Sequence, residues 1–151
     1  MDDFRPINRE IWRGEHVAVQ VLSRSCVRKG ACAHREPYVL ISISVPGVPH
    51  PEPKHGEGHL ETLRLAFHDR LEEGISEAQA AEVADFVKRH HLTGIHLFVV
   101  QCDAGVSRSA AVAAAIWASF EGAADLFFAE YHPNTDTFAK LSEALNHSQG
   151  S

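Results

Sequence analysis

Cys102, Gly105 and Arg108 stand close together in a segment whose residue types could bind and attack a phosphate group. Cys102 follows an apolar run, Gly105 lies in a short turn, and Arg108 precedes an alanine-rich stretch. Free amides and the dipole at a helix start favour an anion, and a tight glycine turn can aim several N–H groups at it. The same field favours a thiolate, and an arginine fork matches two phosphate oxygens. The segment therefore combines a candidate nucleophile, an anion cradle and a cationic clamp.

The elements on either side of this segment predict where it lies in the fold. Ile95–Val100 is a nearly continuous apolar run, as expected for a central parallel strand that is buried on both faces. Ser109–Phe120 has helical propensity, and its alanines permit close packing on a sheet. Ligands of open α/β sheets bind beyond the carboxyl ends of the strands, where helices begin. We therefore expect Cys102 at that edge.

The rest of the chain alternates between strand and helix patterns, with a surface loop rich in proline and glycine at Pro46–His59. Further predicted elements are strands at Val17–Leu22, Tyr38–Val45 and Leu60–Phe67 and helices at Ser76–His90, Asp125–Tyr131 and Thr137–Asn146. This order predicts one α/β domain over residues 1–151, with a central, mostly parallel sheet flanked by helices and a helical C-terminal third. Residues 1–16 and 147–151 are expected at its periphery.

Charge and composition argue against several classes of function. The net charge is −6, and the only basic cluster is Arg24, Arg28 and Lys29, so no nucleic-acid partner is expected. No apolar run reaches the roughly 20 residues that cross a bilayer, so no membrane partner is expected either. The acidic N-terminus and the three cysteines favour the cytoplasm. The eleven histidines scatter without a repeated metal spacing and are expected on the surface.

The segment from Cys102 to Ser109 resembles the C-x-x-G-x-x-R-[ST] phosphate-binding loop of the cysteine-dependent protein tyrosine phosphatases, in particular the small dual-specificity type. A weaker resemblance extends from Tyr38 to Leu145. It implies a metal-independent phosphomonoester hydrolase that forms a cysteinyl-phosphate on Cys102 and needs no cofactor. The loop residues implied to hold the substrate phosphate are Asp103, Ala104, Gly105, Val106, Ser107 and Arg108.

The resemblance also implies a general acid on a loop before the cysteine. Asp69 stands 33 positions before Cys102, just after a predicted strand, and is our candidate for this acid and base. Glu72 and Glu73 in the same acidic turn are alternatives, whereas Asp85 falls within a predicted helix.

Three further residues bear on the candidate site. Ser109 corresponds to the hydroxyl residue that eases breakdown of the phosphoenzyme. His68, beside Asp69, could contact substrate or tune the acid. The family usually has histidine immediately before the cysteine, where this chain has Gln101, whose amide can still donate hydrogen bonds.

Asp103 bears on the substrate. A carboxylate in the loop would repel highly charged phosphoinositide head groups, so a phosphorylated protein or peptide is expected, with phosphotyrosine favoured. Cys26, Cys32 and His34 lack the paired spacings of a structural zinc site, and no metal is expected. The sequence gives no indication of the oligomeric state.

Other functions remain open from the sequence. The main alternative is a catalytically weak pseudophosphatase that binds phosphorylated partners. Gln101 is the one residue that favours this alternative. An RNA triphosphatase would need a basic groove, an arsenate reductase would carry its loop near the N-terminus, and a sulfurtransferase would not require Asp69 or the pair formed by Arg108 and Ser109. Turnover distinguishes an enzyme from a binding module.

Overall fold

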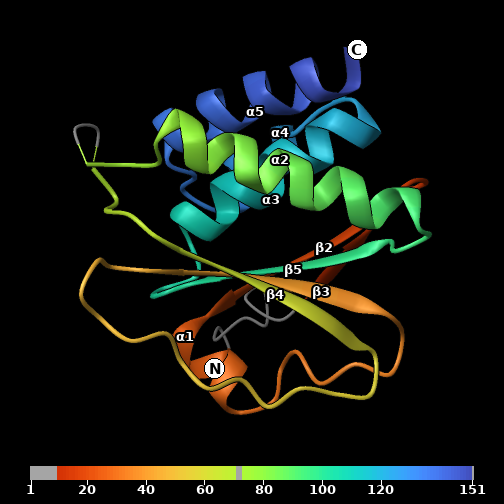
Figure 1. Cartoon of the computed structure of the whole chain (residues 1–151), viewed down its shortest axis with the longest axis vertical. Helices are drawn as coiled ribbons and strands as arrows, with labels where there is room; N and C mark the ends of the chain where they lie inside the picture. The colour runs from red at the N-terminus through yellow and green to blue at the C-terminus, as the bar shows by residue number, and fades with distance from the viewer. Residues whose placement is uncertain (1–9, 71–72, 151) are drawn as a thin grey trace.

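The computed structural model describes residues 10–70 and 73–150, and its centre is a five-stranded sheet (Figure 1). The strands are β1 (Ile11–Arg13), β2 (Ala18–Ser23), β3 (Tyr38–Ser44), β4 (His59–Ala66) and β5 (Leu97–Cys102). They lie in the order β1-β2-β5-β3-β4, with β1 antiparallel to β2 and all other pairs parallel. The central strand is β5, so the carboxyl end of its ladder places Cys102 between the ends of β2 and β3.

Helices cover the two faces of the sheet unequally (Figure 1). The helices are α1 (Arg24–Arg28), α2 (Glu77–Leu92), α3 (Arg108–Glu121), α4 (Asp125–Glu130) and α5 (Thr135–Gly150). Helices α2 to α5 lie on one face, and α3 packs against both β2 and β5. The short helix α1 and two long connections lie on the other face. In the described residues, no helix combines the length and apolar character that a membrane span requires.

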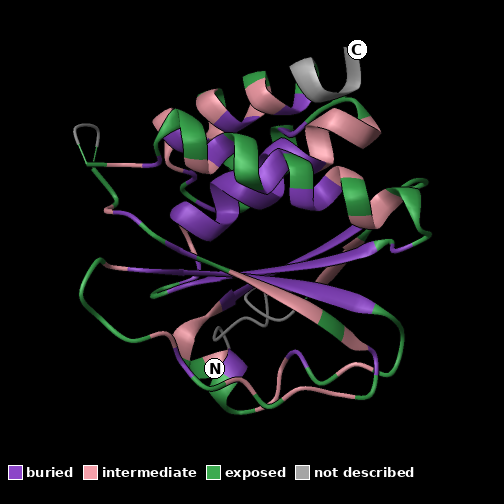
Figure 2. Ribbon diagram, in the orientation of Figure 1, coloured by how far each residue is buried: buried purple, intermediate pink, exposed green. Residues whose placement is uncertain are grey.

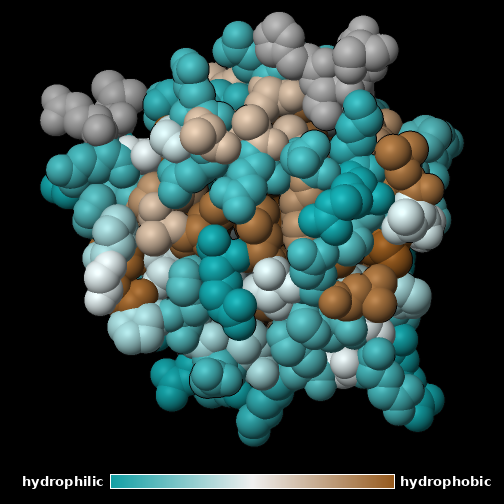
Figure 3. Space-filling model, in the orientation of Figure 1, coloured by the Kyte–Doolittle hydropathy of each residue, from teal (hydrophilic) through white to brown (hydrophobic). Residues whose placement is uncertain are grey.

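Two apolar cores result from the pleat of the strands, because successive side chains point to opposite faces. Phe98 and Val100 of β5 face the helices and join the larger core, whereas Leu97 and Val99 face α1 and join a smaller one. The strands β2, β3 and β5 are almost wholly buried, as Figure 2 shows in purple. The face of the molecule that Figure 3 shows is largely hydrophilic, with apolar surface in separate patches.

The predicted fold class is confirmed, and most predicted elements differ from the observed ones by one or two residues at their ends. Strand β1 was not predicted. Its three residues carry no alternating pattern, and pairing with β2 creates the strand at the sheet edge. There Trp12 stacks on Phe127 of α4 at 4.8 Å between ring centroids. Parts of the terminal segments 1–16 and 147–151 lie outside the described residues.

The prediction that the histidines are surface residues is wrong for a group on the α1 side of the sheet. His34, His50, His55 and His59 are half-buried. His55 Nδ1 hydrogen bonds to Tyr38 Oη at 2.7 Å, and its ring stacks on His59 at 3.5 Å between centroids. The Pro46–His59 loop covers this face, so its histidines meet the polar side chains of β3. The path of the loop determines which histidines are half-buried, and the spacing of the residues in the sequence does not.

We expect this histidine packing to make the fold sensitive to acid. Burial lowers the pKa of His55 to about 4 from the ordinary 6.5, and the charges of His59 and Arg64 add to this. The unfolded chain therefore takes up the proton first, so the stabilisation is complete above about pH 6.5 and is lost as the pH falls towards 4. His55→Gln removes the titrating ring, and the fall in Tm between pH 7 and pH 5 should shrink by about 2–4 °C.

Thermal melts across this pH range check the expectation. His16→Gln serves as the matched control, because His16 is exposed at the β1–β2 turn. An identical fall in Tm for wild type and His55→Gln would show that the packing of His55 does not couple to pH.

Candidate functional site

The loop between β5 and α3 occupies the sheet edge that the sequence analysis indicated. Gly105 has a φ of +75°, and a Cβ there would lie 2.8 Å from the backbone nitrogen of Ser23. Any larger residue would force the loop away from the end of β2. Gly105 is therefore required by both its conformation and its close approach to the neighbouring strand.

Surrounding segments hold this loop through its carbonyl oxygens. The carbonyls of Asp103, Val106 and Ser107 accept hydrogen bonds from the backbone N–H groups of Arg24, His132 and Asn134 at 3.0, 2.9 and 3.1 Å. Two of these donors lie in the connection between α4 and α5, and the third begins α1. The loop is thus fixed by parts of the chain on both sides of the sheet.

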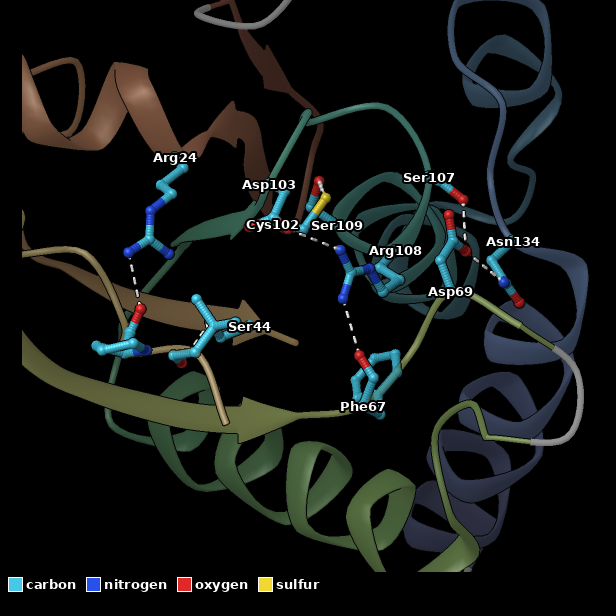
Figure 4. Close-up of polar contacts among 12 residues, drawn as sticks. Arg24, Ser44, Phe67, Asp69, Cys102, Asp103, Ser107, Arg108, Ser109 and Asn134 are labelled. Atoms are coloured by element: carbon cyan, nitrogen blue, oxygen red, sulfur yellow. Dashed lines mark hydrogen bonds and ion pairs between the residues drawn. The ribbon is translucent and has the colours of Figure 1, made fainter. Parts of the chain in front are cut away.

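Cys102 and Ser109 face each other at the base of the loop (Figure 4). Cys102 is 2% exposed, Ser109 is fully buried, and Sγ lies 3.0 Å from Oγ. Ser109 is in the first turn of α3, so the strand and the helix together set this distance. The hydroxyl is positioned to donate a hydrogen bond to the sulfur when the sulfur is a thiolate.

Arg108 is a buried cation with two contacts. Its side chain is 7% exposed; Nη1 donates to the carbonyl of Phe67 at 2.8 Å, and Nη2 lies 3.5 Å from Asp103 Oδ2. Nε is buried and has no hydrogen-bond partner among the described residues. A guanidinium taken out of water needs compensating partners, and among the described residues only the half-exposed carboxylate of Asp103 lies at ion-pair distance. The site is therefore suited to receive an additional anion.

Asp69 reaches the same loop from the end of β4, two residues after Phe67. Its Oδ1 accepts hydrogen bonds from Ser107 Oγ at 2.9 Å and from Asn134 Nδ2 at 2.6 Å (Figure 4). The structure thus brings Asp69 together with Cys102, Arg108 and Ser109, although 38 positions separate Asp69 from Ser107. Of the six residues named from the resemblance, Asp103 to Ser107 form the connection between β5 and α3, and Arg108 is the first residue of α3.

The alternative carboxylates do not reach the loop in the described part of the chain. Glu73 pairs with Arg70 and lies 3.6 Å from His68 Nε2, within its own turn. Glu72 lies outside the described residues. Asp85 is exposed within α2. His68 is directed at Glu73 rather than at Asp69, and its backbone N–H also donates to the Glu73 carbonyl.

Gln101 lies on the opposite face of β5 from Cys102 and belongs to a buried polar chain. Ser42 Oγ donates to Gln101 Oε1 at 2.6 Å, and Ser42 Oγ lies 3.0 Å from His50 Nδ1. The Ser42 proton is used by Gln101, so His50 is the donor to Ser42. Burial lowers the pKa of His50, with the charges of Arg64 and Arg24 adding to the effect. These hydrogen bonds connect Gln101, at the end of β5, to the histidine-rich loop.

Asn134 is a site residue that sequence reasoning missed. Its Oδ1 accepts the N–H of Thr137 at 2.9 Å, which caps the first turn of α5, while its Nδ2 donates to Asp69. Asparagine before a helix indicates the capping role, but the contact with Asp69 depends on where α5 packs. The same packing starts α5 at Thr135, two residues before the predicted start.

The other two cysteines lie away from these contacts. Cys32 is buried, its Sγ lies 3.7 Å from the Lys54 carbonyl, and burial raises the pKa of its thiol to about 11. Cys26, Cys32 and Cys102 form no disulfide with one another. The ring of His34 hydrogen bonds to Gln20 Oε1 at 2.7 Å. No group of three metal-ligating side chains occurs within residues 10–70 and 73–150.

No protein-family model and no curated protein sequence matches the chain. Solved structures do match its fold. A human tyrosine phosphatase-like serine/threonine/tyrosine-interacting protein is 19% identical with a TM-score of 0.63, covering 93% of this chain and 99% of that one. A mouse protein described as a dual specificity phosphatase, solved with zinc tungstate, is 19% identical with a TM-score of 0.64, covering 99% and 94%.

PTPMT1 in complex with PI(5)P has the same fold, at 16% identity and a TM-score of 0.59, covering 93% of this chain and 99% of that one. The chain therefore has the fold of the small dual-specificity phosphatases. This confirms at the level of the fold the resemblance drawn from the segment Cys102 to Ser109.

Proposed function

We propose that this chain, which has the fold of the small dual-specificity phosphatases, is a phosphomonoester hydrolase that works through a cysteinyl-phosphate intermediate. The observation that carries the proposal is the hydrogen bond from Ser107 to Asp69 at 2.9 Å. It joins a carboxyl group to the loop that already holds Cys102, Arg108 and Ser109. A nucleophile, a cationic clamp and an acid around one anion cradle are what phosphoryl transfer to a thiolate requires.

In the first step, the sulfur of Cys102 attacks phosphorus in line with the leaving oxygen. The S–P bond forms as the P–O bond breaks, and Asp69 gives its proton to the departing oxygen. Ser107 and Asn134 both donate to Oδ1 of Asp69, so Oδ2 is the oxygen that carries this proton. Arg108 supplies positive charge to the equatorial oxygens together with the loop amides. Arginine therefore provides the cationic stabilisation, and these steps use no metal.

In the second step, water attacks the phosphorus of the cysteinyl-phosphate. Asp69, now a carboxylate, takes a proton from the water, and the S–P bond breaks to release phosphate and the thiolate. Ser109 Oγ, 3.0 Å from Sγ, donates a hydrogen bond to the sulfur as its negative charge develops. The role of Ser109 is thus to make the sulfur a better leaving group.

The proposed substrate is a phosphorylated protein or peptide, with phosphotyrosine favoured. The net charge of −6 disfavours strongly anionic surfaces as substrates. The alternative, a module that binds phosphorylated partners without turning them over, uses the same cradle but predicts binding without product.

The test is hydrolysis of an aryl phosphate by the purified chain with a chelator present. We expect chelator-resistant release of phosphate, and acid quenching during turnover should trap phosphate on Cys102, detectable by mass spectrometry of the peptide that contains it. Binding of phosphate without any turnover would overturn the enzyme proposal and favour the binding module.

Asp69→Asn should lower kcat about 10²- to 10³-fold for substrates with poor leaving groups, because asparagine cannot donate the proton. Asparagine keeps an oxygen that can accept the hydrogen bonds from Ser107 and Asn134. The alkaline limb of the pH–rate profile, which reports the acid, should disappear in the variant. Aryl phosphates with a good leaving group should be affected much less.

Glu73→Gln is the matched control, since Glu73 lies in the same turn but pairs with Arg70. If this control loses the alkaline limb while Asp69→Asn retains it, Asp69 is not the acid.

A further inference from the structure

A cleft of about 530 Å³ adjoins the phosphate loop and is not used by the steps above. It is lined by Arg24, Ser25, Arg28, Lys29 and Asp103. Four of these residues belong to α1 and its ends, and they include the only basic cluster of the sequence. The parallel pairing of β2 with β5 causes this juxtaposition, because Ser23 at the end of β2 lies beside Cys102 at the end of β5.

The charge of the cleft is positive. Three cationic side chains face a single carboxylate, that of Asp103. Among the described residues, no carboxylate lies within ion-pair distance of Arg24, Arg28 or Lys29. On a chain with a net charge of −6, such a concentration of unpaired cations raises the local concentration of anions.

Arg24 is held in place at the wall of this cleft. Its backbone N–H donates to the Asp103 carbonyl at 3.0 Å, and its Nη2 donates to the Pro49 carbonyl at 2.8 Å. Its Nη1 is buried and has no hydrogen-bond partner within the described part of the chain. The guanidinium is therefore oriented in advance and keeps an unused donor.

The cleft is continuous with the phosphate loop through Asp103. One side of Asp103 lines the cleft, and its Oδ2 lies 3.5 Å from Nη2 of Arg108. Figure 4 shows Asp103 between Arg24 and Arg108. A substrate whose phosphate contacts Arg108 thus has the cleft beside it. Because neighbouring residues of an extended peptide are about 3.3 Å apart along the chain, a group one or two residues from the phosphorylated position can reach it.

We infer that this cleft is a second anion subsite, which takes a negatively charged group next to the phosphorylated residue of a peptide substrate. The inference rests on the proposed function and specifies its substrate class: phosphopeptides with a flanking carboxylate or a second phosphate. The sequence analysis expected repulsion of highly charged groups from Asp103 alone, whereas in the structure Asp103 lines the cleft together with Arg24, Arg28 and Lys29. A peptide is the occupant because three cations on an acidic chain are fewer than the clusters that bind anionic membranes.

The test compares phosphotyrosine peptides that differ at one flanking position, which carries alanine, glutamate or phosphoserine. The position is placed in turn one and two residues to each side. For wild type, kcat/KM should be about tenfold higher with a second anion at the best position, mainly through KM, and phosphoserine should exceed glutamate. The comparison of the glutamate and phosphoserine peptides thus shows whether the cleft prefers a carboxylate or a phosphate.

The variant Arg28→Gln/Lys29→Gln should reduce this preference to near onefold. Its matched control is Arg35→Glu, which changes the net charge equally at an exposed position before β3, on the opposite edge of the sheet. This control should keep both the preference and the activity on an aryl phosphate. Higher salt should lower the wild-type preference, since Arg28 and Lys29 are exposed.

Each remaining outcome is decisive. Wild type that hydrolyses the aryl phosphate but treats all peptides alike overturns the subsite and leaves the proposed function standing. Wild type without any turnover overturns the proposed function, and the peptide affinities of Cys102→Ser then decide the subsite. Faster turnover of vesicles containing a phosphoinositide bisphosphate, lost in Arg28→Gln/Lys29→Gln, would overturn the assignment to peptides.

Discussion

Cys102→Ser is expected to lower kcat/KM for aryl phosphates by about 10⁴-fold or more, because the serine hydroxyl is not ionised at neutral pH and forms no phosphoenzyme under these conditions. The substitution changes one buried atom and leaves the hydroxyl of Ser109 at hydrogen-bond distance from it. The fold and the anion cradle should therefore survive. The measurement is the hydrolysis rate together with phosphate binding by calorimetry, with binding expected to persist.

Cys26→Ser is the matched control for this prediction. Cys26 is a half-buried cysteine of α1 outside any disulfide, and the variant should hydrolyse substrate at close to the wild-type rate. If Cys102→Ser retains activity while Cys26→Ser loses it, the nucleophile is not Cys102.

Arg108→Lys is expected to lower kcat/KM by about 10³-fold, which corresponds to about 4 kcal/mol of transition-state stabilisation. Lysine keeps the positive charge but lacks the planar fork that can contact two phosphate oxygens at once. It also cannot hold the Phe67 carbonyl and a second group in the geometry that Nη1 and Nη2 define. Both kcat and KM should change, because the clamp contacts the phosphate before and during the transfer.

The control for Arg108→Lys is Arg13→Lys, since Arg13 forms an exposed ion pair with Glu36 on the sheet edge far from the loop. Circular dichroism and Tm establish that the Arg108 variant is folded. A folded Arg108→Lys with wild-type kcat/KM would contradict the proposed clamp.

Most of the fold could be predicted because its signals are local. The apolar run before Cys102 predicted a central strand, and β5 is buried at every position. Strand β1 could not be predicted, because three residues carry no periodic pattern and form a strand only where β2 presents an edge. The half-burial of His34, His50 and His55 was missed for a related reason, since the composition of a loop does not determine which face of the sheet it covers.

The sequence by itself determined the local arrangement of the loop that we propose to bind phosphate. The residues from Cys102 to Ser109 lie in one continuous strand, turn and helix start, so their types and spacing fix their mutual positions within a few ångströms. Only the tertiary structure decided what surrounds that loop. The ends of β2 and β4 deliver Arg24 and Asp69 to it, and the segment before α5 delivers Asn134. Those contacts depend on the order of strands in the sheet, and that order cannot be deduced from the positions of the strands in the sequence.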